Sequence, residues 1–279
     1  MILSRLFRRA LPAALLFTAA LAHAEDWAAR PDWGKYFEAQ HARGTFVLYD
    51  AQAARYSVYN PERANKGYLP ASTFKIPNAL LALDAGVVKD ENEVFRWDHK
   101  PQPRKEWEQD LTFAAALKVS AVPVFQAVAR RLGPQRMQAG VTRLNYGNHD
   151  TSGAVDRFWL SGALRITALQ QVEFLRRLEA GQLPVSKRSM AIVRKMMIVE
   201  TSPPGAALPY VIHAKTGTLG ADAPEPVMWW VGWIERPAPK GVQRWFFAMN
   251  MDLLPGGNFE DRFNVARPIL REAGALPEK

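Results

Sequence analysis

The residues best suited to chemistry in this chain are Ser72 and Lys75, which lie three positions apart in Ser72-Thr73-Phe74-Lys75. On a helix, this spacing places both side chains on one face, one turn apart. A serine hydroxyl is a poor nucleophile at its ordinary pKa and needs an adjacent base. A lysine becomes that base when burial among apolar side chains lowers the pKa of its amine. The pair therefore indicates acyl transfer, although roughly one such tetrad is expected by chance in a chain of this length.

Four more short motifs follow in order: Ser120-Ala121-Val122, Tyr146-Gly147-Asn148, Trp159-Leu160-Ser161-Gly162 and Lys215-Thr216-Gly217. Each has an ordinary structural explanation. Ser120 has the residue type of a helix N-cap, Tyr146 begins a turn, and Trp159 is typical of a packed core. On a strand, Lys215 and Gly217 share one face, and a glycine there leaves room for another backbone. Together and in this order, the motifs favour one catalytic site.

The surrounding sequence predicts the elements that position these residues. Short alternating apolar runs at 44–50 and 55–59 predict two strands, and a helix begins at Ser72 and runs to about Ala85. Helical periodicity returns at about 123–132, 134–144, 167–178, 186–199 and 260–275, and β-rich runs occupy 210–218, 227–235 and 244–252. The pattern predicts an α/β (α+β) fold. Its mainly antiparallel sheet is built from both ends of the chain and flanked by helices, and an all-helical lobe of about residues 85–200 is inserted between them.

The N-terminus has the pattern of a secretory signal peptide. A basic stretch at residues 5–9 precedes an apolar run at 11–21 and the small-residue cleavage signal Ala22-His23-Ala24. The apolar run is shorter than the about 20 residues that span a bilayer. We therefore expect residues 1–24 to be cleaved after Ala24, leaving 25–279 as a single catalytic domain with no further membrane span.

Composition argues against several classes of protein. The formal net charge is +9, but lysines and arginines are interspersed with acids, and no basic block carries interleaved aromatic residues. Nucleic-acid binding is therefore disfavoured. The chain has no cysteine, which excludes disulfides and cysteine-ligated metals, and its five histidines show no metal-binding spacing.

Taken together, the motifs resemble those of the class D serine β-lactamases, the oxacillinase family. The resemblance runs from about Gly44 to Leu276 and includes the predicted strands around Trp229–Trp233 and Phe246–Asp252. It implies a β-lactamase and transpeptidase-like fold that hydrolyses penicillins and related β-lactams and confers antibiotic resistance. It also implies a periplasmic location, a monomer or homodimer, and no metal cofactor.

The same resemblance implies a role for individual residues. Ser72 is the nucleophile, and Ser120 relays a proton to the departing lactam nitrogen. Lys75 reacts with CO2, supplied as bicarbonate, to become a carboxylated lysine that acts as general base, and Trp159 holds that group. The backbone N–H groups of Ser72 and Thr218 form the oxyanion site. The implied substrate contacts are Lys215, Thr216, Gly217, Thr218, Arg262, Val122, Leu160, Trp107 and Tyr146.

Related serine enzymes are the alternatives to a class D β-lactamase. In class A β-lactamases and penicillin-binding proteins the middle motif usually ends in Asn, where this chain has Val122. Class A also needs a glutamate three residues before a Leu-Asn pair, and Val141 occupies that position. A covalent β-lactam sensor or a penicillin-binding protein, which traps the acyl group without efficient turnover, remains the alternative function. His213 could be proposed as a base, but a surface histidine is the expectation.

Overall fold

The structure is a computed structural model that describes residues 26–220, 223–254 and 257–278. The predicted signal peptide and its cleavage site after Ala24 lie outside the described residues.

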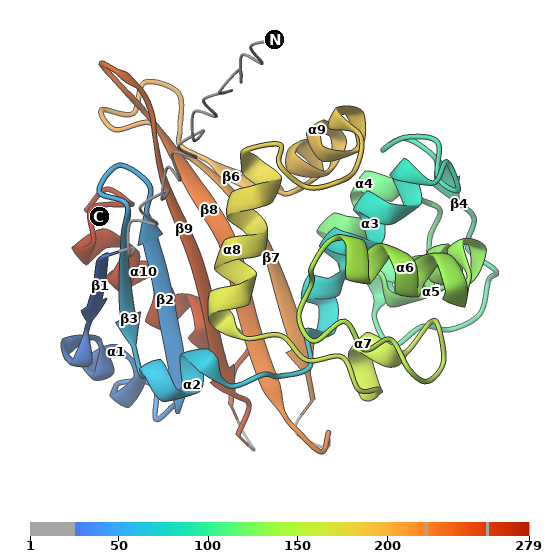
Figure 1. The fold of residues 1–279 in the computed structure, drawn as a ribbon, viewed down its shortest axis with the longest axis horizontal. Helices are drawn as coiled ribbons and strands as arrows, with labels where there is room; N and C mark the ends of the chain where they lie inside the picture. Colours follow the sequence, from blue (N-terminus) through green and yellow to red (C-terminus); the bar gives the residue numbers. More distant parts are fainter. Residues whose placement is uncertain (1–25, 221–222, 255–256, 279) are drawn as a thin grey trace, which may run out of the picture.

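One sheet dominates the molecule (Figure 1). Within the described residues its seven strands follow the order β1-β3-β2-β9-β8-β7-β6. β1 pairs with β3 in parallel, and every other neighbouring pair is antiparallel. The prediction of a mainly antiparallel sheet from both ends of the chain is confirmed. The strands are β1 Asp26–Ala29, β2 Gly44–Asp50, β3 Arg55–Tyr59, β6 Ile198–Thr201, β7 Val211–Leu219, β8 Val227–Ala238 and β9 Gly241–Asp252, with β4 Val94–Phe95 and β5 Leu111–Thr112 in a separate ribbon.

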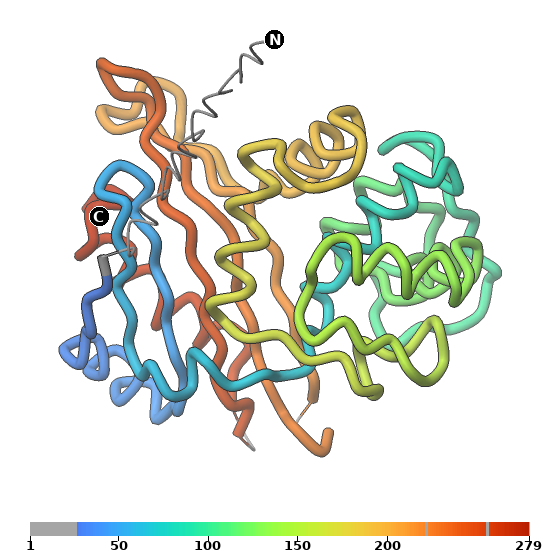
Figure 2. Tube along the Cα trace, viewed as in Figure 1, coloured from blue at the N-terminus to red at the C-terminus, as the bar shows by residue number. Residues whose placement is uncertain are grey.

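Helices lie on both faces of the sheet and in a group beside it (Figure 1). The α-helices are α1 Gly34–Glu38, α2 Pro61–Asn65, α3 Lys75–Asp84, α4 Phe113–Lys118, α5 Val122–Leu132, α6 Pro134–Arg143, α7 Phe158–Ser161, α8 Ala168–Glu179, α9 Lys187–Met196 and α10 Asp261–Glu272. Three 3₁₀-helices that are described join them: η1 Pro31–Trp33, η2 Ala71–Phe74 and η3 Lys105–Trp107. The trace in Figure 2 shows α3 to α7 grouped together beside the edge of the sheet.

The sheet is buried on both faces, as β2 illustrates. Alternation along the strand sends Val47 and Tyr49 into one apolar core and Phe46 and Leu48 into the other. α8 covers the first face, and α1 and α10 cover the second. α8 falls inside the range predicted for the inserted lobe, but its apolar side packs against β2, β8 and β9. The helical lobe is therefore interrupted by a helix that belongs to the sheet.

One predicted helix is shorter than expected. The sequence predicts a helix over 186–199, but α9 ends at Met196 and residues 198–201 form the edge strand β6. β6 pairs with β7, and the amide of Ala214 donates to the carbonyl of Met197 at 2.8 Å. The β-branched pair Ile198 and Val199 suits this extended edge better than a last helical turn.

Candidate active site

The predicted nucleophile and base lie where η2 passes into α3. Ser72 is in the 3₁₀ turn and Lys75 is the first residue of α3, so their side chains meet across one turn. The Lys75 Nζ donates to the Ser72 Oγ at 2.6 Å. Lys75 has an exposed fraction of 0%. Burial, and secondarily the charges of Lys215 and Arg104, hold the pKa of Lys75 well below its ordinary value. The structure thus provides a hydroxyl in contact with an amine that loses its proton readily.

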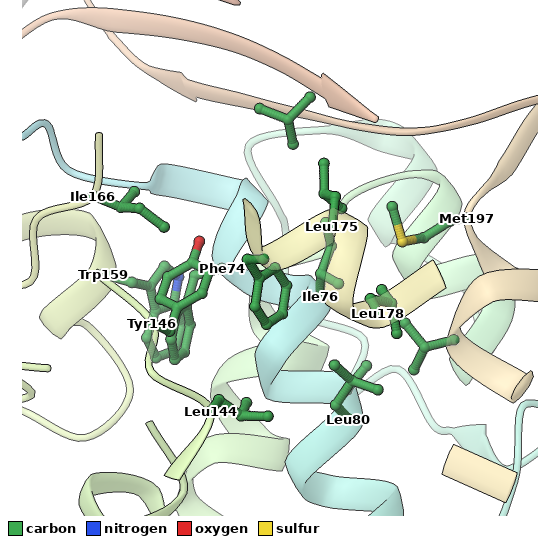
Figure 3. Packing of buried hydrophobic residues seen from close by; sticks show 14 of the residues in the cluster. Phe74, Ile76, Leu80, Leu144, Tyr146, Trp159, Ile166, Leu175, Leu178 and Met197 are labelled. Atoms are coloured by element: carbon green, nitrogen blue, oxygen red, sulfur yellow. The ribbon is translucent and has the colours of Figure 1, made fainter. Parts of the chain in front are cut away.

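Aromatic rings pack around the turn that carries this amine. The Nζ of Lys75 lies 5.6 Å from the centroid of the Phe125 ring. Trp159 of α7 is fully buried and stacks on Phe74 with ring centroids 5.3 Å apart. Figure 3 shows Trp159 and Phe74 packed together with Tyr146 in this core. The buried Nε1 of Trp159 has no acceptor within the described part of the chain. A buried donor without an acceptor is costly, so this nitrogen favours an additional oxygen atom as its acceptor.

Ser120 and Lys215 form the second polar pair of the site. The Lys215 Nζ donates to the Ser120 Oγ at 3.0 Å and to the Thr216 carbonyl at 2.9 Å. Ser120 has a φ of 58°, a left-handed conformation that is uncommon for a serine. The ordinary role considered for Ser120, a helix N-cap, is wrong, because the N-cap of α5 is Ala121. Burial, reinforced by the charges of Arg262 and Arg104, lowers the pKa of Lys215 to about 7.

Gly217 permits β7 to approach the helix that carries the nucleophile. A Cβ at this position would lie 2.9 Å from the carbonyl oxygen of Pro70 and 3.2 Å from the amide nitrogen of Thr73. Both distances are too short for a methyl group to fit without displacement. The prediction that this glycine makes room for another backbone is confirmed. Thr218, the next residue of β7, is thereby held beside the turn that contains Ser72.

Arg262 of α10 is buried beneath the same strand, with an exposed fraction of 4%. Its Nη1 donates to the carbonyls of Gly217 and Trp229, both at 3.2 Å, and its Nε donates to the carbonyl of Phe259 at 2.6 Å. Burial lowers the pKa of Arg262 to about 10. These bonds fix the guanidinium at the cleft, so the arginine is not an ordinary exposed helix residue.

A cavity of about 610 Å³ joins these groups. Trp107 lies in its wall, and its Nε1 donates to the carbonyl of Val119 at 3.0 Å, next to Ser120. The predicted residues that line the cavity are Ser72, Trp107, Ser120, Val122, Thr216, Thr218 and Arg262. Arg104, Phe259, Glu260 and Phe263 also line it and had not been predicted. The two unexpected aromatic side chains come from the start of α10, where no catalytic motif marked them.

Comparison with known proteins identifies the family. The family model of the penicillin binding protein transpeptidase domain matches residues 44–271. β-Lactamase OXA-10 of Pseudomonas aeruginosa is 43% identical over 246 residues, which cover 88% of this chain and 89% of the relative. β-Lactamase OXA-48 of Klebsiella pneumoniae is 40% identical over 254 residues, covering 91% and 92%. The solved class D β-lactamase YbXI from Nostoc superposes with a TM-score of 0.81 at 34% identity, covering 88% of this chain and 99% of that one.

The chain belongs to the class D β-lactamases. These enzymes are serine hydrolases that need no metal ion. Among the residues that the structure describes, no group of three or more His, Asp or Glu side chains could hold one. No helix of the described ranges combines the length and the apolar content needed to cross a bilayer.

Four of the predicted substrate contacts are not among the residues that line the cavity of this class D enzyme: Lys215, Gly217, Leu160 and Tyr146. The last two belong to the apolar core or pack against it. Tyr146 is fully buried, its ring meets that of Phe74 edge-on at 5.8 Å, and its hydroxyl accepts from the Nε2 of Gln171 at 3.3 Å. Leu160 is half-buried and packs against the same apolar core. The prediction of direct substrate contact is therefore wrong for the fully buried Tyr146, whereas for the half-buried Leu160 it stays a prediction. Both residues pack into or against the apolar core behind the turn that carries Ser72. Sequence spacing does not reveal where that core lies.

His213 is also buried rather than on the surface. Its ring stacks on Trp233 with centroids 4.4 Å apart, and its Nδ1 lies 2.9 Å from the Arg194 carbonyl oxygen. Burial lowers its pKa. The edge strand β6 pairs with β7 beside His213, and the carbonyl of Arg194 in α9 contacts its ring; neither contact was apparent from the sequence.

A buried polar contact next to the nucleophile was missed as well. The Gln171 Nε2 donates to the Thr73 Oγ1 at 2.9 Å, and that hydroxyl donates to the Pro70 carbonyl at 2.7 Å. Gln171 lies on the apolar face of α8, with an exposed fraction of 0%. A glutamine among Val and Leu at helical spacing was the signal that could have indicated this contact.

Proposed function

We propose that this class D β-lactamase opens the β-lactam ring of penicillins and related antibiotics through an acyl-enzyme on Ser72, and that this activity confers antibiotic resistance. The observation that supports this best is the 2.6 Å contact between the Lys75 Nζ and the Ser72 Oγ in a buried pocket. The Lys75 side chain supplies the base that removes the hydroxyl proton, and the freed oxygen attacks the lactam carbonyl.

We further propose that Lys75 acts in its carboxylated form. A neutral amine is needed to attack CO2, and burial favours the neutral amine of Lys75. The unpartnered Nε1 of Trp159 is a donor that can hold a carboxylate oxygen. Once formed, the carboxyl group on Lys75 supplies an anionic general base, first for the hydroxyl of Ser72 and later for the hydrolytic water. CO2 or bicarbonate is then the sole accessory requirement.

Lys215 and Ser120 are suited to protonate the departing ring nitrogen. With a pKa of about 7, Lys215 can give up a proton near neutral pH. Its Nζ lies 3.0 Å from the Ser120 Oγ, which lies in the cavity wall beside Ser72. We propose that Ser120 passes its proton to the lactam nitrogen while Lys215 replaces it. The C–N bond then breaks without leaving an amide anion.

The other predicted residues would orient the substrate and its developing charge. Thr216, Thr218 and the buried Arg262 line the cavity and can hold the substrate carboxylate. We propose that the backbone N–H groups of Ser72 and Thr218 stabilise the oxyanion, since Gly217 allows β7 to approach η2 closely. Val122 and Trp107 supply apolar walls for the ring and side chain.

Turnover of benzylpenicillin by the purified protein tests the function. We expect complete hydrolysis of a large excess of substrate, with only transient acylation of Ser72 visible by mass spectrometry. Stoichiometric acylation that persists without turnover would instead identify a covalent sensor or a penicillin-binding protein.

Labelling with ¹³C-bicarbonate tests the base. We expect one carbamate resonance by NMR, loss of activity on CO2 depletion and its recovery on adding bicarbonate. Lys75→Ala should lose both the resonance and turnover while remaining folded, whereas Lys89→Ala, at an exposed lysine, should keep both. Substantial deacylation by Lys75→Ala would refute the proposed role.

Export to the periplasm is the proposed location. The basic and apolar pattern of residues 1–24 supports it, and 25–279 would then act as one catalytic domain. N-terminal sequencing of the exported protein should begin at Glu25. We propose a monomer or a homodimer, which light scattering distinguishes.

A further inference from the structure

One cation in the wall of the cavity makes no contact that the mechanism above uses. Arg104 lines the same 610 Å³ cavity as Ser72, Trp107 and Arg262. It lies outside every motif that indicated the site and comes from the segment that leads into η3. Its charge is close enough to contribute to the lowered pKa of both Lys75 and Lys215. A positive charge of this kind attracts anionic groups of a bound molecule.

Arg104 is held in place by its neighbours. It has extended backbone, with φ −132° and ψ 130°, and its carbonyl accepts from the Trp107 amide at 3.0 Å. Its guanidinium carbon lies 5.7 Å from the centroid of the Trp107 ring. That ring is itself anchored to the carbonyl of Val119. The arginine and the tryptophan therefore form one aromatic and cationic wall beside Ser120.

The donors of Arg104 remain available to a ligand, in contrast to those of Arg262. Arg262 is buried and donates to three backbone carbonyls. Arg104 has half of its side chain exposed (51%) and pairs with Glu106 at 3.0 Å, whose side chain is equally exposed (52%). An ion pair between two exposed side chains is weak, so another carboxylate can replace Glu106. Among the described residues that line the cavity, Glu260 is the one acid. It lies two positions before Arg262 in the sequence.

We propose that Arg104 and Trp107 form a second anion subsite that binds an acidic group on the substrate side chain, separate from the ring carboxylate held at Arg262. The inference rests on the proposed function and specifies its substrate class: penicillins whose side chain bears both an aryl group and a second carboxylate. The Trp107 ring packs against the aryl group. The guanidinium of Arg104 donates to the side-chain carboxylate in place of Glu106.

Paired substrates isolate this contact. Carbenicillin and benzylpenicillin share the ring system and the phenyl side chain, and they differ by one side-chain carboxylate. In Arg104→Gln we expect kcat/KM for carbenicillin to fall about tenfold, through a higher KM, while kcat/KM for benzylpenicillin changes less than twofold. Glu106→Gln, which removes the competing carboxylate, should raise kcat/KM for carbenicillin and leave that for benzylpenicillin unchanged.

The matched control is Arg96→Gln. Arg96 also carries an exposed ion pair, with Asp110 at 2.5 Å, and lies in the wall of a different cavity. Arg96→Gln removes the same charge as Arg104→Gln. A loss of kcat/KM that comes only from weaker general attraction of anionic substrates would therefore appear equally in this control. Salt should weaken the advantage of the wild type over Arg104→Gln for carbenicillin alone.

The possible outcomes distinguish failure of the proposed subsite from failure of the proposed function. Equal losses for both penicillins in Arg104→Gln would show that Arg104 binds the ring carboxylate, and no loss for either would show that it does not touch the substrate. Either result overturns the subsite. Failure of the wild type to turn over benzylpenicillin would instead refute the proposed function itself.

Discussion

At the residue scale, the site depends on two lysines whose ordinary basicity is suppressed. Lys75 is fully buried with the Phe125 ring beside its amine, and Lys215 is buried near the charges of two arginines. In both, burial is the largest cause of the lowered pKa. Neither lysine has a carboxylate as a described hydrogen-bond partner; they contact Ser72 and Ser120 instead. Each of these easily deprotonated amines contacts a serine hydroxyl. The Lys75 pair is suited to removing a proton from Ser72, and the Lys215 pair to delivering one through Ser120.

Val122→Asn tests whether dryness controls the first lysine. An amide at the cavity wall would bring water toward Lys75 and raise the pKa of its amine toward the ordinary value. We expect the carboxylated form to weaken near neutral pH, so that several-fold more bicarbonate is needed for full activity. Val122→Leu, which keeps the wall apolar, should respond to bicarbonate like the wild type. An unchanged bicarbonate requirement in Val122→Asn would contradict this account.

Lys215→Met tests the second lysine through stability. Folding lowers the pKa of Lys215 from 10.5 to about 7, so between these values the unfolded chain binds a proton that the folded chain lacks. The contribution of this site to the free energy of unfolding therefore rises with pH from about 7 upward. The variant lacks that contribution, and the stability of the wild type relative to the variant should rise across the window. Urea denaturation measures it, and parallel pH curves would be the negative result.

At the element scale, the proposed mechanism depends on β7 and η2 lying almost in backbone contact. The sheet supplies β7, the η2–α3 segment supplies Ser72 and Lys75, and Gly217 is where the two meet. The carbonyl of the same residue accepts from Arg262 of α10. One small residue therefore sets the positions of the turn with Ser72, the strand β7 and Arg262, which is proposed to bind the substrate carboxylate.

Gly217→Ala should disturb all three. The added Cβ would meet the Pro70 carbonyl oxygen at 2.9 Å, and neither backbone can yield easily. We expect a loss of about 1–3 kcal/mol in stability together with a fall in kcat/KM. Gly220→Ala is the control, because a Cβ at Gly220 meets no atom within 4 Å among the described residues. Wild-type kinetics in Gly217→Ala would show that the approach of β7 is not needed.

At the scale of the whole molecule, Glu272 connects the start of the described chain to its last helix. Its Oε1 accepts from the Nη2 of Arg30 at 2.5 Å and the Nε1 of Trp33 at 3.1 Å. Its Oε2 accepts from the hydroxyl of Tyr36 at 2.7 Å and the Nζ of Lys35 at 3.0 Å. Burial raises the pKa of this carboxyl, but these hydrogen bonds outweigh it and lower the pKa overall. α1 and α10 are thereby fixed together on one face of the sheet.

Glu272→Ala should lower the stability of the whole molecule by about 1–2 kcal/mol, because several donors lose a charged acceptor. The difference from the wild type should disappear as pH falls through the lowered pKa of the carboxyl, since protonation removes the same charge. Turnover by the folded protein should not change, since α1 lies across the sheet from the nucleophile. Glu38→Ala, at an exposed residue at the end of α1, is the control for thermal unfolding. An equal effect in both variants would show that the cluster is not specific.

Most of the elements could be predicted from local sequence. β2 and β3 begin and end as predicted, because short runs rich in β-branched and aromatic residues, joined by a turn, specify them locally. α8 begins after the predicted Thr167, whose capping box with Gln170 is encoded within one turn. β6 could not be predicted, because residues 198–201 are extended only through pairing with β7.

The sequence by itself determined the reactive pair and its order among the other motifs, since a three-residue offset on a helical turn fixes Ser72 against Lys75. The tertiary structure alone decided which residues surround that pair. It buried Tyr146 and His213, left the Trp159 Nε1 without a described acceptor and brought Arg104 into the cavity wall. The physical reason is that hydrogen-bond reach along a helix is local, whereas burial and charge depend on segments that are distant in the chain and meet only when the sheet and helices pack.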